Sequence, residues 1–221
     1  MAISRTILFL TLLPVVTVAL YVSLLGVNIP FWDQWIVLPL LIKKSEGLLS
    51  LADLLAQHNE HRPLFPRLIW LWLSGFTHYN VKMELWANLA LYLATFSFFI
   101  HRTAKMWQMN AVSISPYTLP LLSLLMFNLG QYESWLQGFQ TVMFLGICSV
   151  VVGLFLVAEK DSNLSFSAAT VLGVIAAFSM ANGLLYWPIG LGILLLSGSP
   201  NKNRVKIFVW LVVSALSIGL F

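Results

Sequence analysis

Charged residues are scarce in this chain of 221 residues, since Asp, Glu, Lys and Arg together make up only 9% of it. Soluble domains average about 25% charged residues, so a water-facing globular protein is excluded. The apolar share is 59%, and several charge-free stretches reach the ~20 residues with which a helix crosses the hydrocarbon core. The composition therefore predicts an integral, multi-pass membrane protein in contact with membrane lipids.

Cysteine occurs once, as Cys148 within an apolar run, so no intrachain disulfide can form. The 12 basic residues outnumber the 8 acidic ones, but they are scattered between apolar segments, which argues against a nucleic-acid partner. Phosphate-cradling glycine loops and nucleophile elbows are also missing from the sequence. Their absence disfavours nucleotide-dependent enzymes and serine hydrolases.

The charge-free stretches predict an all-α fold. They cover residues 6–32, 106–132, 134–158 and 162–201. The last stretch can hold two passes, with Asn182–Pro188 as the break between them. We expect one transmembrane domain over residues 1–221 with about seven spans, or eight in the alternative. It would comprise a first helix over 7–27, an outer-face loop with juxtamembrane helices over 28–82, and a helix bundle over 83–221.

Basic residues indicate the orientation of these spans. Arg5 precedes the first helix and Arg102 follows the helix over 83–100, so the positive-inside rule places the N-terminus in the cytoplasm. The helix over 116–130 then runs outward. Residues 68–81 number 14, which is short for a crossing, so we expect a juxtamembrane or re-entrant helix. If they crossed instead, every later loop would change sides. A bacterial inner membrane or a plasma membrane suits this topology.

Half of the eight acids fall in the outer-face loop. They are Asp33, Glu46, Asp53 and Glu60. Asp33 directly follows the first helix, in Phe31-Trp32-Asp33-Gln34-Trp35, and Glu60 lies in the polar run His58-Asn59-Glu60-His61-Arg62-Pro63. The sequence therefore predicts that chemistry takes place in this loop, with Asp33 and Glu60 as the candidate catalytic acids.

The polar run follows a predicted helix start, because Ser50 and Asp53 have the spacing of a capping box. His58 and His61 are three residues apart and would share a helical face. With Glu60 between them they could ligate a divalent metal, but the longer zinc patterns are missing. We therefore predict no metal or other cofactor and favour a hydrogen-bonded acid–base or phosphate site.

Three polar and aromatic segments meet at the outer face in the predicted topology: Asp33 with residues 58–67, residues 131–140, and residues 182–188. Such convergence is typical of a binding site. The candidate substrate-binding residues are His58, His61, Arg62, Arg67, Glu133, Trp135, Asn182 and Trp187. The alternative is an interfacial aromatic belt with snorkelling arginines. Asn88 is interpreted as an interhelical hydrogen-bond donor.

This layout resembles the GT-C superfamily of integral-membrane glycosyltransferases, including its protein O-mannosyltransferase and aminoarabinose-transferase branches. The resemblance rests on Asp33 after the first helix, on the turn His58–Pro63 and on the juxtamembrane segment Leu64–Gly75. It implies that a sugar passes from a polyprenyl-phosphate-linked donor to an acceptor on the extracytoplasmic side.

The resemblance also implies roles for the loop residues. Asp33 would take the proton of the acceptor hydroxyl, and Glu60 would orient a histidine or help to bind the acceptor. The lipid phosphate would be bound by Arg62 and Arg67, together with His58 or His61. The sugar or the prenyl chain would pack against Trp135 or Trp187.

Two departures from the family layout keep alternatives open. The family often has adjacent acids in this loop, whereas Gln34 follows Asp33 here, and the long C-terminal part does not follow Phe221. The chain would then be an N-terminal fragment of such an enzyme, or it would act with a partner subunit. A non-catalytic subunit that binds a lipid-linked intermediate is one rival. A transport or flippase component is another, which the near absence of polar residues from the spans disfavours.

The predicted topology can be tested by thiol labelling of intact cells. Single cysteines at positions 33, 60, 78, 133 and 186, in a Cys148→Ser background, are expected to react with an impermeant reagent from outside. If positions 133 and 186 reacted only from the cytoplasm, residues 68–81 would be a true span and the three segments would not share a face.

Overall fold

A computed structural model describes residues 4–111, 115–159, 162–196 and 204–221. Over these residues the chain is helical and contains no strand, which confirms the predicted fold class. The chain divides into two compact units, and each takes two segments of the sequence. The first consists of Met1–Trp35 and Leu73–Gln140, and the second of Ile36–Trp72 and Thr141–Phe221.

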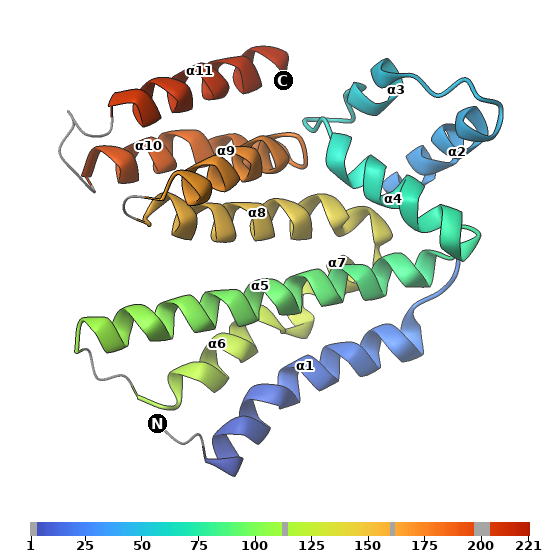
Figure 1. Cartoon of the computed structure of the whole chain (residues 1–221). Coiled ribbons are helices and arrows are strands. Elements are labelled where there is room, and N and C mark those ends of the chain that lie inside the picture. Colours follow the sequence, from blue (N-terminus) through green and yellow to red (C-terminus); the bar gives the residue numbers. More distant parts are fainter. Residues whose placement is uncertain (1–3, 112–114, 160–161, 197–203) are drawn as a thin grey trace. The chain divides into compact units, whose positions relative to one another are not determined.

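The first unit is built on two long helices, α1 (Arg5–Leu25) and α5 (Val81–Met109), with the short α6 (Thr118–Met126) beside α1 (Figure 1). The Asn80 side chain caps α5 by accepting a hydrogen bond from the Lys82 amide at 3.1 Å. The buried Ser123 hydroxyl donates to the Thr11 carbonyl at 2.6 Å. This hydrogen bond joins α6 to α1 within an otherwise apolar contact.

A helix is predicted over residues 116–130, but α6 is shorter than expected and ends at Met126. The Asn128 amide donates to the Leu125 carbonyl at 2.7 Å, and Trp135 donates to the Asn128 carbonyl at 3.1 Å. These bonds satisfy the backbone where the helix stops. The chain continues as the short turns η2 (Leu129–Gln131), α7 (Tyr132–Leu136) and η3 (Gly138–Gln140).

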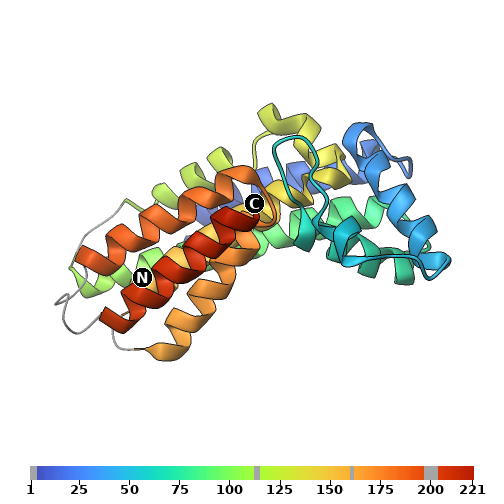
Figure 2. The same ribbon diagram turned by 90° about the horizontal axis from the view of Figure 1, so that it is seen from above.

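The second unit places α8 (Thr141–Val157), α9 (Asn163–Ala177), α10 (Tyr186–Leu196) and α11 (Arg204–Leu220) side by side, as Figures 1 and 2 both show. The turn η4 (Ala181–Leu185) separates α9 from α10 and confirms the break predicted near Asn182. The earlier segment of this unit holds α2 (Val37–Ser45), α3 (Leu51–Leu55) and the first part of α4 (Leu64–Thr77).

Glycines make room for large aromatic side chains in the core of the second unit. A Cβ atom added at Gly153 or Gly173 would lie 2.5 Å from atoms of the fully buried Tyr186 ring or hydroxyl. One added at Gly190 would lie 2.2 Å from the ring of buried Trp210. Small residues at helix contacts are the usual device by which membrane helices approach closely. Trp210 is fixed further by its donation to the Trp187 carbonyl at 3.0 Å.

Within the part of the chain that the structure describes, three helical segments are long and apolar enough to cross a membrane: Arg5–Leu25, Val81–Met109 and Gly138–Val157. Two further apolar segments, Asn163–Ala177 and Ala181–Leu196, are shorter. The membrane character of the chain therefore agrees with the prediction from composition, whereas the count of about seven spans is not confirmed. Of the five positions proposed for thiol labelling, Tyr186 is fully buried, so the topology is tested at the other four positions.

Replacement of Gly190 by Ala should destabilise the second unit by about 1–3 kcal/mol, because the new methyl group overlaps the buried Trp210 ring. Gly192 on the same helix is a matched control, since a Cβ atom there meets nothing within 4 Å. Its replacement by Ala should be neutral or stabilising by up to about 1 kcal/mol. Thermal unfolding in detergent measures both changes, and equal effects would contradict the packing described.

Candidate functional site

Asp33 lies on a single turn of 3-10 helix, η1 (Trp32–Ile36), a few residues after α1, and its side chain is half-buried. The Phe31 and Trp32 rings stack at 5.2 Å beside it. Trp32 and Trp35 remain 64% and 53% exposed, so they do not enclose the carboxylate within this unit. The fixed feature of the turn is its next residue, Gln34, which is completely buried.

Gln34 connects η1 to the first turn of α5. Its Nε2 donates a hydrogen bond to the carboxyl group of Glu84, which is only 2% exposed. The Gln34 Oε1 atom has no hydrogen-bond partner among the described residues. Burial of an amide and a carboxyl group among apolar helices is costly unless they bind one another, so this pair specifies one arrangement of the turn.

The segment after α7 closes over this pair at Gly138. A Cβ atom at Gly138 would lie 2.2 Å from both Gln34 Nε2 and Glu84 Oε2, so a larger residue there would displace the ends of these two side chains. Asn88, one turn along α5 from Glu84, donates to the carbonyls of Gln137 and Gly138 at 3.4 Å each. Asn88 is thus a hydrogen-bond donor, as predicted, but its acceptors lie in the segment after α7 and not within a neighbouring long helix.

Glu84 was not singled out from the sequence because it lies inside a predicted apolar helix. A signal was present, however, since Glu84 and Asn88 are four residues apart and therefore share a helical face. A carboxyl and an amide on one face of an otherwise apolar helix indicate a buried polar contact. That reasoning would have found α5 but not its partner Gln34, which lies 50 residues earlier.

Glu133 and Trp135 also belong to the first unit, and they differ in burial. Trp135 is 2% exposed and packs against Phe127 at 6.1 Å and Tyr92 at 5.6 Å between ring centroids. Glu133 is exposed and accepts a hydrogen bond from the Tyr132 hydroxyl at 3.1 Å. Trp135 is thus a core residue in this unit, whereas Glu133 lies at its surface.

The histidine cluster forms a turn in the second unit and not a helical face, which corrects the prediction. The backbones of His58 and His61 exchange two hydrogen bonds, at 2.8 and 2.9 Å. Asn59 has a positive φ of 48°, which Asn tolerates better than most residues. The physical reason is that α3 ends at Leu55, so both histidines lie beyond the helix, on either side of the turn at Asn59 and Glu60.

His61 is held from two sides. Its Nδ1 accepts a hydrogen bond from the Ala181 amide at 3.1 Å, and its Nε2 lies 3.3 Å from the Glu60 carboxylate. Because Nδ1 acts as an acceptor, the neutral ring carries its proton on Nε2 and donates it to Glu60. The Glu60 side chain is 72% exposed. This part of the site therefore presents an open carboxylate beside an anchored imidazole.

Both arginines bind the carbonyl end of α3. Arg62 donates to the Leu55 carbonyl at 3.0 Å and to the Phe221 carbonyl. Arg67 is 4% exposed and donates to the carbonyls of Leu54 and Ala56, while its Nε has no partner among the described residues. Burial lowers the pKa of the Arg67 guanidinium. Cations at the end of a helix satisfy carbonyls that have no partner within it.

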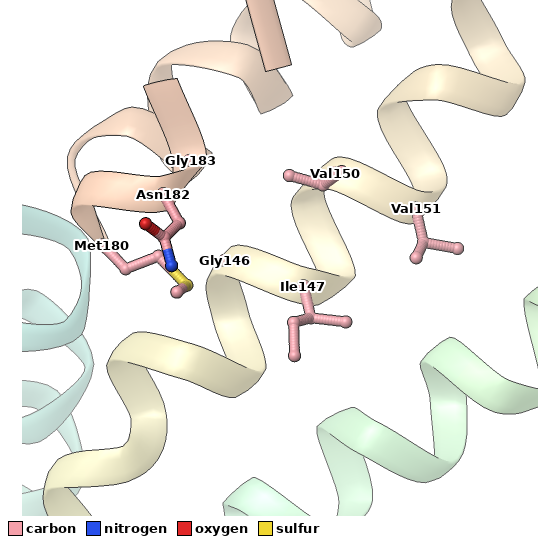
Figure 3. Close-up of a pocket in the computed structure, with 7 residues that line it drawn as sticks. All are labelled: Gly146, Ile147, Val150, Val151, Met180, Asn182 and Gly183. Carbon is pink, nitrogen blue, oxygen red and sulfur yellow. The ribbon is translucent and has the colours of Figure 1, made fainter. Parts of the chain in front are cut away.

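Asn182 lines a pocket of about 210 Å³ in the second unit. Figure 3 shows Met180 and Asn182 reaching from the turn before α10 toward α8. The rest of the lining is Gly146, Ile147, Val150, Val151 and Gly183. Trp187 lies elsewhere, 2% exposed and packed edge-on against Trp210 at 5.0 Å between centroids. Asn182 is thus open to a ligand, whereas Trp187 belongs to the core.

The predicted residues are divided between the units. Asp33, Glu133 and Trp135 belong to the first unit, and residues 58–67, Asn182 and Trp187 belong to the second. Among the residues that the structure describes, no three His, Cys, Asp or Glu side chains are grouped to hold a metal ion. The first unit thus offers a half-buried carboxylate, that of Asp33, next to an anchored glutamine. The second unit offers a carboxylate–imidazole pair, Glu60 with His61, near the Arg62 guanidinium.

Comparison with known proteins adds no relative to this description: no protein-family model, curated protein or solved structure matches the chain.

The carboxylate of Asp53 gives the polar loop a dependence on pH. It accepts hydrogen bonds from Lys43 and from the Ser50 hydroxyl at 2.7 Å and amide at 3.0 Å, which confirms the predicted capping box. These hydrogen bonds lower the pKa of Asp53 to about 2, and the bond from Lys43 has the largest effect. The pKa of Asp53 is lower in the folded protein than in the unfolded chain. The ionised carboxylate therefore stabilises the fold at pH values above the unfolded pKa, and this stabilisation is lost as the pH falls toward the folded pKa.

An Asp53→Asn variant should therefore be less stable than the parent at neutral pH, and the difference should shrink as the pH falls from about 5 to 2. Thermal unfolding over this range measures the difference. Glu46→Gln, at an exposed acid in the same loop, serves as the control and should give a smaller difference. A difference for Asp53→Asn that stays constant with pH would contradict the assignment.

Proposed function

We propose that this chain acts in the transfer of a sugar from a polyprenyl-phosphate-linked donor to a hydroxyl acceptor on the extracytoplasmic side of a membrane, with Asp33 as the general base. The observation that carries the proposal is the anchoring of η1. Asp33 follows a helix long enough to cross the membrane, and the adjacent Gln34 is bound to buried Glu84. A carboxylate on an anchored turn just beyond an apolar helix can meet a substrate whose tail stays in the lipid.

The reaction requires two kinds of group. Asp33 would take the proton of the acceptor hydroxyl as its oxygen bonds to the anomeric carbon, while the bond from that carbon to the donor phosphate oxygen breaks. The polyprenyl phosphate leaves with the negative charge and needs donors to bind it.

A second candidate is a non-catalytic subunit that binds a lipid-linked intermediate for a partner enzyme. The burial of Arg67, Trp135 and Trp187 favours it, because three residues expected to contact substrate are used in packing. Asn182 and the pocket beside it would then provide the binding surface. The two candidates differ in whether Asp33 is needed for turnover or only for binding.

An Asp33→Asn variant separates them. Purified protein is mixed with a membrane extract that supplies acceptors and with a polyprenyl phosphate that carries a tritium-labelled hexose. Loss of tritium from the lipid donor is followed, because the hexose leaves this lipid whichever acceptor receives it. We expect the variant to lose roughly 10²–10⁴-fold in turnover, the usual contribution of a general base, with donor binding unchanged. Glu46→Gln is the control for loss of one acid from the same loop.

Equal turnover by Asp33→Asn and the parent would overturn the role of Asp33. Donor binding without turnover in the parent would favour the binding subunit, and absence of both would overturn the lipid-linked donor.

A further inference from the structure

We infer that Glu84 is a positioning residue: through Gln34 it fixes the turn that carries Asp33. This inference rests on the proposed function for its catalytic meaning, whereas its geometry stands on the first unit alone. Glu84 touches no reacting group in the proposal. Its carboxyl group binds the side chain of the residue next to Asp33, so it acts on Asp33 only through the backbone of η1.

The anchoring matters because both tryptophan side chains of η1 are largely exposed. Trp32 and Trp35 are 64% and 53% exposed, and Trp32 adopts a positive φ of 51°, a conformation that few non-glycine residues take. Within the turn only Gln34 is buried. Its bond to Glu84 therefore sets where the turn lies against α5, and with it the position of the Asp33 carboxylate.

The buried pair is enclosed on a further side, which makes the anchor rigid. A methyl group at Gly138 would overlap the ends of the Gln34 and Glu84 side chains, so they fit there only as long as that residue is glycine or they shift. Asn88 holds the Gln137 and Gly138 carbonyls in place from α5. On the other side of η1, the Asn28 side chain accepts a hydrogen bond from the Val81 amide at 2.7 Å. The chain around Asp33 is thus tied to α5 both before and after η1 begins.

A merely structural role for the pair can be distinguished from a positioning role. Replacement of a buried polar pair by apolar side chains of similar volume is often neutral or stabilising for the fold. Apolar side chains do not, however, specify the orientation of a turn as a hydrogen bond does. The double variant Gln34→Leu with Glu84→Leu should therefore keep the fold and release η1, which separates stability from position.

The experiment uses Asp33→Cys in a Cys148→Ser background and measures the rate of thiol labelling at position 33. We expect labelling to rise about fivefold in the double Leu variant and in Gly138→Ala, which displaces the pair without altering either partner. Glu84→Gln keeps a hydrogen-bonding partner for Gln34 and should label like the parent. Thermal unfolding of each variant shows whether the fold is retained.

The same changes are then made in protein with Asp33 intact, and turnover of the tritium-labelled polyprenyl-phosphate hexose is measured. The double Leu variant should lose about 10- to 100-fold in kcat with KM unchanged, because a misplaced base fails in the transition state and not in binding. Glu84→Gln should retain turnover. A double Leu variant that retains its melting temperature but loses kcat would not be explained by a structural role.

Each outcome decides something different. Labelling at position 33 that is unchanged in both the double Leu variant and Gly138→Ala would overturn the positioning role. Increased labelling with no turnover even in the parent would leave the anchor in place and overturn the proposed function. If the double Leu variant unfolds, Gly138→Ala supplies the same comparison.

Discussion

A carboxyl group buried among apolar helices requires a hydrogen-bond partner, and in the first unit this requirement joins three distant parts of the chain. Glu84 supplies the group, Gln34 supplies the donor, and the Gly138 backbone closes over both. Hydrophobic contact between α1, α5 and α6 would tolerate many small shifts, since apolar surfaces are not directional. The polar pair is directional and selects one arrangement of the turn that bears Asp33.

Close approach of helices plays the corresponding part in the second unit. The Tyr186 and Trp210 rings fill space beside Gly153, Gly173 and Gly190. These rings fit there because the glycines have no side chain. The donors of Trp210 and Tyr186 then bind backbone carbonyls at 3.0 and 2.8 Å. In both units the apolar surface drives association, while a few polar or very small residues determine the geometry.

Properties that depend on composition and local spacing could be predicted from the sequence. The helical fold, the capping box at Ser50 and the break near Asn182 follow from such patterns, and all three appear in the structure. The early end of α6 could not be predicted, because it depends on a bond from Trp135 to the Asn128 carbonyl. The Gln34–Glu84 pair and the burial of Trp135 likewise come from contacts between distant residues, which no local pattern encodes.

The interleaved connectivity of the two units has a consequence for biosynthesis. The first unit lacks its closing segment until Gln140 has been made, although its α1 is synthesised before the other described helices. Residues 36–72 are synthesised before that point, yet their partners in α8 to α11 follow only after it. Translation thus makes this segment, which includes Arg67, well before the helices of its own unit are available to pack against it, and such a segment is open to proteases and chaperones in the meantime.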